Sequence, residues 1–157
     1  MTRHAHRLVP WQRHALYWSA GLLTATGAVW LAVHYGVGAG SANELPHPLE
    51  AWLMRLHGLL GYMGLFVLGV LAAGHVPQGW RLAGRHRWAR QRSSGAALCM
   101  LAAVLSLTGY LLNYFAPEGV RPVLGWVHAL VGLAMGALLV RHRRRGAAPP
   151  PSERERA

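Results

Sequence analysis

Six histidines lie within or at the ends of long apolar stretches of this 157-residue chain. They are His14, His34, His57, His75, His128 and His142. An ionisable side chain is costly inside a membrane and marks a functional candidate. Neutral imidazole binds iron through one ring nitrogen, and two imidazoles from facing helices can clamp a flat porphyrin. Because the chain has one cysteine and no C-x-x-C-H motif, covalently attached c-type haem is excluded.

The segments that carry these histidines have the composition of membrane helices. Hydrophobic residues make up 53% of the chain and charged residues 13%. No Asp, Glu, Lys or Arg occurs in four stretches, which are residues 15–43, 56–80, 93–117 and 122–140. Each reaches about the 20 residues that a helix needs to cross hydrocarbon. We therefore predict an all-α integral membrane protein, a bundle of four transmembrane helices at about 14–36, 52–76, 93–115 and 122–141.

The arginines predict the orientation of these helices. Fourteen of the sixteen lie in the two terminal segments and in the connection between the second and third helices, and only Arg55 and Arg121 lie on the opposite side. This positive-inside pattern predicts a multi-pass membrane protein with both termini cytoplasmic. Residues 1–13 would form a basic cytoplasmic N-terminus, and residues 143–157 a disordered cytoplasmic tail.

Two other interpretations of the sequence are less favoured. The net charge of +11 could indicate nucleic-acid binding, but the basic residues adjoin apolar spans, so membrane lipid is the expected partner and nucleic acid is not. The small residues in VGAGSANEL resemble a signal-peptide cleavage site, but the apolar run before them is long for a signal peptide.

Depth within the predicted helices sorts the six histidines into two layers. The outer layer holds His57, His128 and His34, and the inner layer holds His75, His14 and His142. At about 100° per residue, residues 57 and 75 are five full turns apart and point the same way, about 27 Å apart along the axis. Residues 128 and 142 lie within about 40° of one face. Residues 14 and 34 differ by about 200°, so at most one faces a common seam. Two haems stacked across a membrane require two such layers.

Small and polar residues accompany these histidines. Glycines lie near His57 (Gly61, Gly64) and near His128 (Gly125, Gly132, Gly136), where a porphyrin would need close approach of the backbone. The same spacing is typical of contacts between membrane helices, so it does not decide between a porphyrin site and simple helix packing. The third helix has no histidine. We expect it to shape the pocket and to offer a hydrogen bond to a ligand imidazole from Thr108, Tyr110, Asn113 or Tyr114.

The order of RHALYWSAGLLTATGAVW, RLHGLLGYMG, GHV, SSGAALCMLAAVLSLTGYLLNYF and WVHALVGLA resembles the small four-helix b-type cytochromes of bacterial inner membranes. These are the cytochrome b561-like group and the haem-binding subunits of hydrogenases and formate dehydrogenases, and the resemblance covers about residues 13–142. It implies two haem b groups between bis-histidine pairs. It also implies electron transfer between a quinone pool or soluble donor and a partner protein.

The resemblance also implies ligands. His57 and His128 would ligate the outer haem, and His75 one face of the inner haem, with His14 or His142 opposite. Arg55 and Arg121 would pair with haem propionates or anchor the outer interface. The His-Trp pair that opens the first helix in the family is Tyr17-Trp18 here, so a single haem is also open.

The resulting hypothesis is a b-type cytochrome that acts as an electron-transfer subunit rather than a self-contained enzyme. A non-haem scaffold or assembly subunit of a redox complex is the first alternative. A small proton or metal conduit is the second, although it lacks acidic residues within the spans. With no paired carboxylates, Ser/His/Asp set or phosphate loop, the sequence does not support hydrolytic chemistry.

Overall fold

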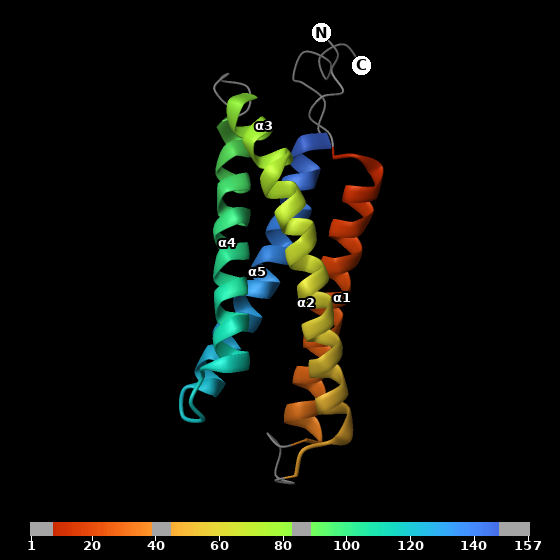
Figure 1. Ribbon diagram of the computed structural model, residues 1–157, viewed down its shortest axis with the longest axis vertical. Helices are drawn as coiled ribbons and strands as arrows, with labels where there is room; N and C mark the ends of the chain where they lie inside the picture. Colours follow the sequence, from red (N-terminus) through yellow and green to blue (C-terminus); the bar gives the residue numbers. More distant parts are fainter. Residues whose placement is uncertain (1–7, 39–44, 83–88, 148–157) are drawn as a thin grey trace. The chain divides into compact units, whose positions relative to one another are not determined.

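A computed structural model describes residues 8–38, 45–82 and 89–147, and these residues are helical without any strand (Figure 1). The helices are α1 (Pro10–Gly36), α2 (Pro48–Ala73), α3 (His75–Leu82), α4 (Ala89–Tyr114) and α5 (Arg121–Ala147). Within the described residues, four helical stretches are long and apolar enough to cross a membrane: Pro10–Gly36, Pro48–Gly79, Ser93–Tyr114 and Arg121–Arg144. The prediction of an all-α chain with four such helices is confirmed.

The first two long helices begin about four residues earlier than the charge-free stretches suggested. Each has a proline at its first helical position, where the missing N–H costs no hydrogen bond. At α2, the His47 backbone N–H donates to the Glu50 carboxylate (2.8 Å), and the Leu49 N–H donates to Nδ1 of His47 (3.2 Å). Polar caps at Glu50 and His47 therefore extend the helix beyond its apolar run.

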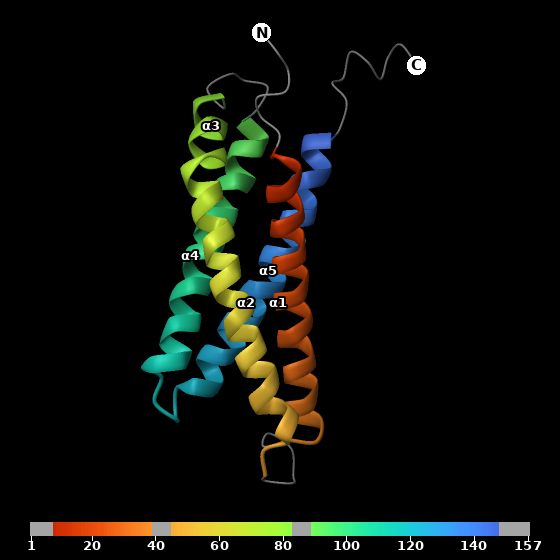
Figure 2. The same ribbon diagram turned by 45° about the vertical axis from the view of Figure 1, so that its right-hand side comes forward.

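Helices α1 and α2 form one antiparallel hairpin within residues 1–78, and α4 and α5 form a second within residues 79–157 (Figures 1 and 2). Glycines bring the paired helices close together. A Cβ at Gly64 of α2 would lie 3.2 Å from Leu23 of α1, and one at Gly132 of α5 would lie 3.8 Å from Leu105 of α4. These two glycines pack helix against helix, as small residues do in membranes.

Helix α2 ends before His75, contrary to the predicted helix of residues 52–76. Gly74 is the C-cap of α2, and its N–H still donates to the Val70 carbonyl (3.2 Å), while α3 starts at the next residue. The five-turn relation between His57 and His75 assumed an unbroken helix. Their common direction therefore does not follow from spacing alone.

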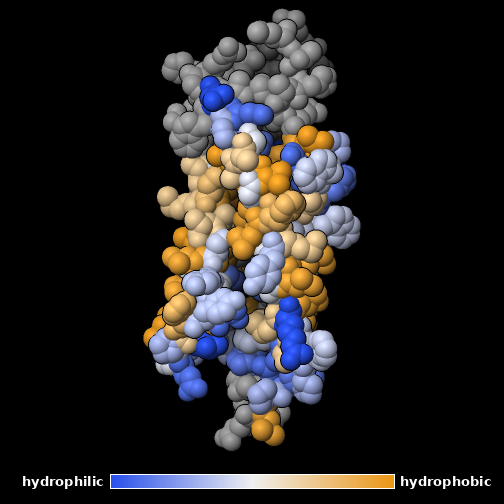
Figure 3. Space-filling view, viewed as in Figure 1, coloured by the Kyte–Doolittle hydropathy of each residue, from blue (hydrophilic) through white to orange (hydrophobic). Residues whose placement is uncertain are grey.

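Large apolar side chains cover much of the helical surface (Figure 3). Phe66 of α2 is 69% exposed and Met100 of α4 is 70% exposed. Exposure on this scale is unfavourable in water but suits a hydrocarbon environment. It agrees with a multi-pass membrane protein.

Candidate histidine sites

Four polar or charged residues are buried in the described part of the chain, and each contacts a histidine. Their exposed fractions are 8% for Thr26, 7% for Glu50, 5% for Ser94 and 7% for Thr108. They hydrogen-bond Nδ1 of His57, His34, His142 and His128, respectively. The polar groups that these apolar hairpins bury are thus arranged around histidines.

In the first hairpin, Thr26 of α1 contacts His57 of α2 with 2.9 Å between Oγ1 and Nδ1. The threonine hydroxyl also lies 2.8 Å from the Leu22 carbonyl oxygen, four residues earlier, to which it donates. A hydroxyl has one hydrogen, so when Thr26 donates to Leu22 its Oγ1 can only accept from Nδ1–H of His57. In a neutral ring that tautomer would place the lone pair on Nε2, the atom suited to metal ligation.

The second hairpin repeats this arrangement. Thr108 of α4 lies 2.8 Å from Nδ1 of His128 of α5, and its hydroxyl donates to the Val104 carbonyl oxygen at 2.8 Å. The expectation that a polar group of the third predicted helix bonds a candidate ligand is confirmed for Thr108. The corresponding partner of His57, Thr26, was missed.

A glycine follows the hydroxyl residue in each of three pairs and makes room for the imidazole. A Cβ at Gly27 would lie 3.4 Å from Cε1 of His57, one at Gly109 would lie 3.4 Å from Cε1 of His128, and one at Gly95 would lie 3.8 Å from Cε1 of His142. We call each dipeptide a hydroxyl–glycine seat: Thr26-Gly27, Ser94-Gly95 and Thr108-Gly109. These three glycines lie on the helix that faces the histidine, and they are different residues from the own-helix glycines that were expected to flank a porphyrin.

The inner-layer candidates differ in their surroundings. His142 lies on α5 with Nδ1 2.8 Å from Ser94 of α4. Since His128 also bonds α4, the prediction that residues 128 and 142 share a face of their helix is confirmed. His14 of α1 is exposed, whereas His75 at the start of α3 is half-buried.

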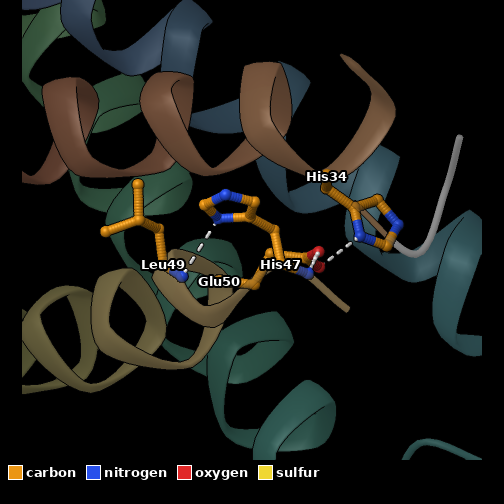
Figure 4. Close-up of polar contacts among 4 residues, drawn as sticks. All are labelled: His34, His47, Leu49 and Glu50. Atoms are coloured by element: carbon orange, nitrogen blue, oxygen red, sulfur yellow. Dashed lines mark hydrogen bonds and ion pairs between the residues drawn. The ribbon is translucent and has the colours of Figure 1, made fainter. Parts of the chain in front are cut away.

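His34 has a partner of a different kind (Figure 4). Its Nδ1 lies 2.7 Å from Oε2 of Glu50, whose other oxygen accepts from the His47 backbone. The His34 ring stacks on Trp30 with 4.5 Å between centroids and 12° between planes. We call the His34–Glu50 pair the carboxylate latch, because it joins the ends of α1 and α2 beside their connection.

The other predicted site residues contact neighbours at the helix ends. The Arg55 guanidinium lies 5.1 Å from the centroid of the Trp52 ring, and Arg121 donates to the Ala116 carbonyl oxygen (3.1 Å). Tyr110 and Tyr114, considered as partners of an imidazole, pack against each other at 5.1 Å. The proposed contacts of these arginines with propionates stay predictions.

The site residues are distributed over both hairpins. His57 and His34 belong to the first hairpin, and His128 and His142 to the second, so the pairing of His57 with His128 stays a prediction. Within the described residues, no group of three or more His, Cys, Asp or Glu could hold a metal ion. A haem with two axial histidines does not need such a group, since its porphyrin supplies the other ligands.

No protein-family model, curated protein or solved structure matches this chain. Its function is therefore argued from the geometry of the histidines.

Proposed function

We propose that the chain is a b-type cytochrome, an electron-transfer subunit of a bacterial inner membrane with both termini cytoplasmic. His57 and His128 would be the axial ligands of a haem b in the outer half of the membrane. The observation that carries this proposal is the recurrence of one geometry in both hairpins: a buried threonine bonded to Nδ1 of a histidine, beside a glycine.

The chemistry of this donor set fits haem. An imidazole that donates from Nδ1 carries its lone pair on Nε2, and ligating histidines typically donate their other N–H to a protein acceptor. Apart from the neighbouring residues and backbone of its own helix, no described atom would lie within 4 Å of a Cβ at Gly61 or Gly125, which flank His57 and His128. Small side chains there would let a flat ring approach the backbone. When bound, haem would supply a one-electron redox couple in an apolar medium.

A second haem would use the inner histidines. His75 would be one ligand, and either His142 or His14 the other. The buried Ser94 beside His142 gives that histidine a hydroxyl partner at Nδ1, as His57 and His128 have, whereas His14 is exposed. This comparison favours His142 and a total of two haems, with one haem as the alternative.

The electron partners would be a quinone or a redox protein at either membrane face. The apolar surfaces of both hairpins would contact lipid and exclude water from the histidines, and the arginine-rich segments would hold the cytoplasmic side. Arg55 and Arg121, on the opposite side, would be placed to meet propionates or lipid headgroups.

A dithionite-reduced minus oxidised spectrum of membranes that contain the full chain tests the proposal. We expect b-type α and Soret bands that are lost in His57→Ala and His128→Ala and retained in His86→Ala, a histidine of the connection outside the described residues. A purified wild-type protein without these bands, after expression with sufficient haem, would refute the proposal.

A non-haem scaffold is the second candidate, because the same hydrogen bonds satisfy Nδ1 of each histidine within its own hairpin. In that role His57 and His128 would only join helices. Their alanine variants would then lose stability but the wild type would have no haem spectrum, which separates the two functions.

A further inference from the structure

We propose that Thr26 and Thr108 are positioning residues: they fix the tautomer and ring orientation of His57 and His128 and thereby lower the reduction potential of the bound haem. The effect on the reduction potential rests on the proposed function. The effect on the tautomer is a property of the chain alone and is testable without a cofactor.

The hydroxyl hydrogens decide the direction of both hydrogen bonds. Oγ1 of Thr26 lies 2.8 Å from the carbonyl oxygen of Leu22 and 3.1 Å from that of Leu23. Oγ1 of Thr108 lies 2.8 Å from the carbonyl oxygen of Val104 and 3.2 Å from that of Leu105. With its only hydrogen directed to the helix carbonyls, each oxygen is an acceptor. We therefore assign Nδ1–H of each imidazole as the donor in these two bonds.

The orientation of each ring is set by the hydrogen bond at Nδ1. The facing glycine leaves the Cε1 edge uncrowded, since a Cβ at Gly27 or Gly109 would lie 3.4 Å from Cε1 of His57 or His128. The bond to the threonine limits rotation of the ring about its Cβ–Cγ bond, and with it the direction of Nε2.

The type of acceptor sets how strongly the ring would donate electrons to a metal. Glu50, which bonds His34 in the first hairpin, is a carboxylate and would pull the Nδ1 proton strongly. A threonine hydroxyl is neutral and pulls it less. A more weakly polarised imidazole is a weaker donor and favours the reduced metal. Hydroxyl acceptors at His57 and His128 therefore give a higher potential than carboxylates would, and removing them should raise it further.

Nitrogen NMR of the full chain in nanodiscs, with ¹⁵N-labelled histidine and no haem added, tests the tautomer. We expect the Nδ1–H form for His57 and His128. His47 is an internal reference, because its Nδ1 accepts from the Leu49 N–H and its proton must be on Nε2. Thr26→Val and Thr108→Val should shift the respective histidine toward a mixture, and Thr→Ser should restore the wild-type signal. An Nε2–H form of His57 and His128 in the wild type would overturn the proposal.

A redox titration of the haem-loaded protein tests the potential. We expect each valine variant to raise the reduction potential of the haem by about 59 mV. For one electron, this equals a tenfold change in the protein's affinity for oxidised haem relative to reduced haem. Each serine variant should remain near the wild type. The matched control is Thr24→Val, since Thr24 of the same helix also donates to a carbonyl four residues earlier (2.8 Å) but is exposed.

The two proposals fail in different ways. A protein that binds no haem but shows Nδ1–H signals loses the proposed function and keeps the positioning role. A protein that binds haem, with potential and tautomer unchanged in both valine variants, keeps the function and loses this inference. Thr→Val preserves side-chain shape, and a far-ultraviolet circular dichroism spectrum like that of the wild type establishes that the variant is folded.

Discussion

Removing the carboxylate latch should reveal a strong coupling between the two helices of the first hairpin. Glu50 is 7% exposed and has a hydrogen bond on each oxygen, from Nδ1 of His34 (2.7 Å) and from the His47 backbone (2.8 Å). Glu50→Ala deletes both bonds, and His34→Ala deletes one bond together with the stacking on Trp30. The double variant deletes the shared bond only once. A double-mutant cycle therefore isolates the His34–Glu50 bond.

The magnitudes follow from the types of contact. A helix-capping hydrogen bond contributes about 1 kcal/mol and one to a charged group about 2 kcal/mol, so Glu50→Ala should cost about 3 kcal/mol. His34→Ala should cost a similar amount, about 2 kcal/mol for the bond and about 1 kcal/mol for the stacked ring. The coupling free energy should then be about 2 kcal/mol. Typical hydrogen bonds between membrane helices couple by only about 0.6 kcal/mol.

Equilibrium unfolding in mixed micelles, followed by circular dichroism, measures the four free energies. Glu118→Ala is the matched control, because this glutamate is exposed in the α4–α5 connection. A coupling below about 0.6 kcal/mol, no stronger than an ordinary interhelical bond, would refute the latch. We also expect haem content at the wild-type level in His34→Ala. Loss of haem in that variant would instead make His34 a ligand.

Substitutions at three further positions test contacts made by small residues. Gly38→Ala places a Cβ against the latch carboxylate and should destabilise the chain by about 1–3 kcal/mol in the same unfolding assay; unchanged stability would contradict this close approach. Gly109→Leu should displace the His128 ring and lower haem affinity by about tenfold, whereas Gly109→Ala, whose Cβ would lie 3.4 Å from Cε1, should bind nearly as the wild type does. Haem per protein measures both, and equal affinities for the alanine and leucine variants would argue against the seat. Ser94→Ala removes the hydroxyl beside His142 and should shift the potential of the inner haem alone in a resolved titration; an unshifted inner component would count against ligation by His142.

The helices were predictable from the sequence because a helix that crosses hydrocarbon needs a long apolar run, and charged residues mark where each run ends. Their ends were less predictable, since caps decide them: Pro48 and Glu50 extend α2 backwards across a charged residue. The break at Gly74 was not foreseen either. A glycine is tolerated within a membrane helix, so its presence alone does not signal an end.

The histidine contacts were predictable in part. Helical angle placed residues 128 and 142 on one face, because that inference needs only a single regular helix. To predict Thr26 and Ser94 as partners, one would need to know how each helix is rotated about its axis relative to its neighbour. That rotation depends on packing at positions such as Gly64. One signal was present: a Thr-Gly dipeptide occurs both in the first and in the third apolar stretch, and a Ser-Gly dipeptide opens the third.

The direction of these bonds weighs in favour of ligands over structural links. A histidine that merely joins two helices can use either ring nitrogen, as donor or as acceptor. His47, which has a structural role as a helix cap, accepts at Nδ1. His57 and His128 instead bond at Nδ1 to a threonine hydroxyl that also lies 2.8 Å from a carbonyl oxygen of its own helix. The same partner type recurs in two separate hairpins, and the Nδ1–H tautomer proposed above would leave the Nε2 lone pair for a metal. This recurrence is what the proposed ligation would require, and a purely structural link would not.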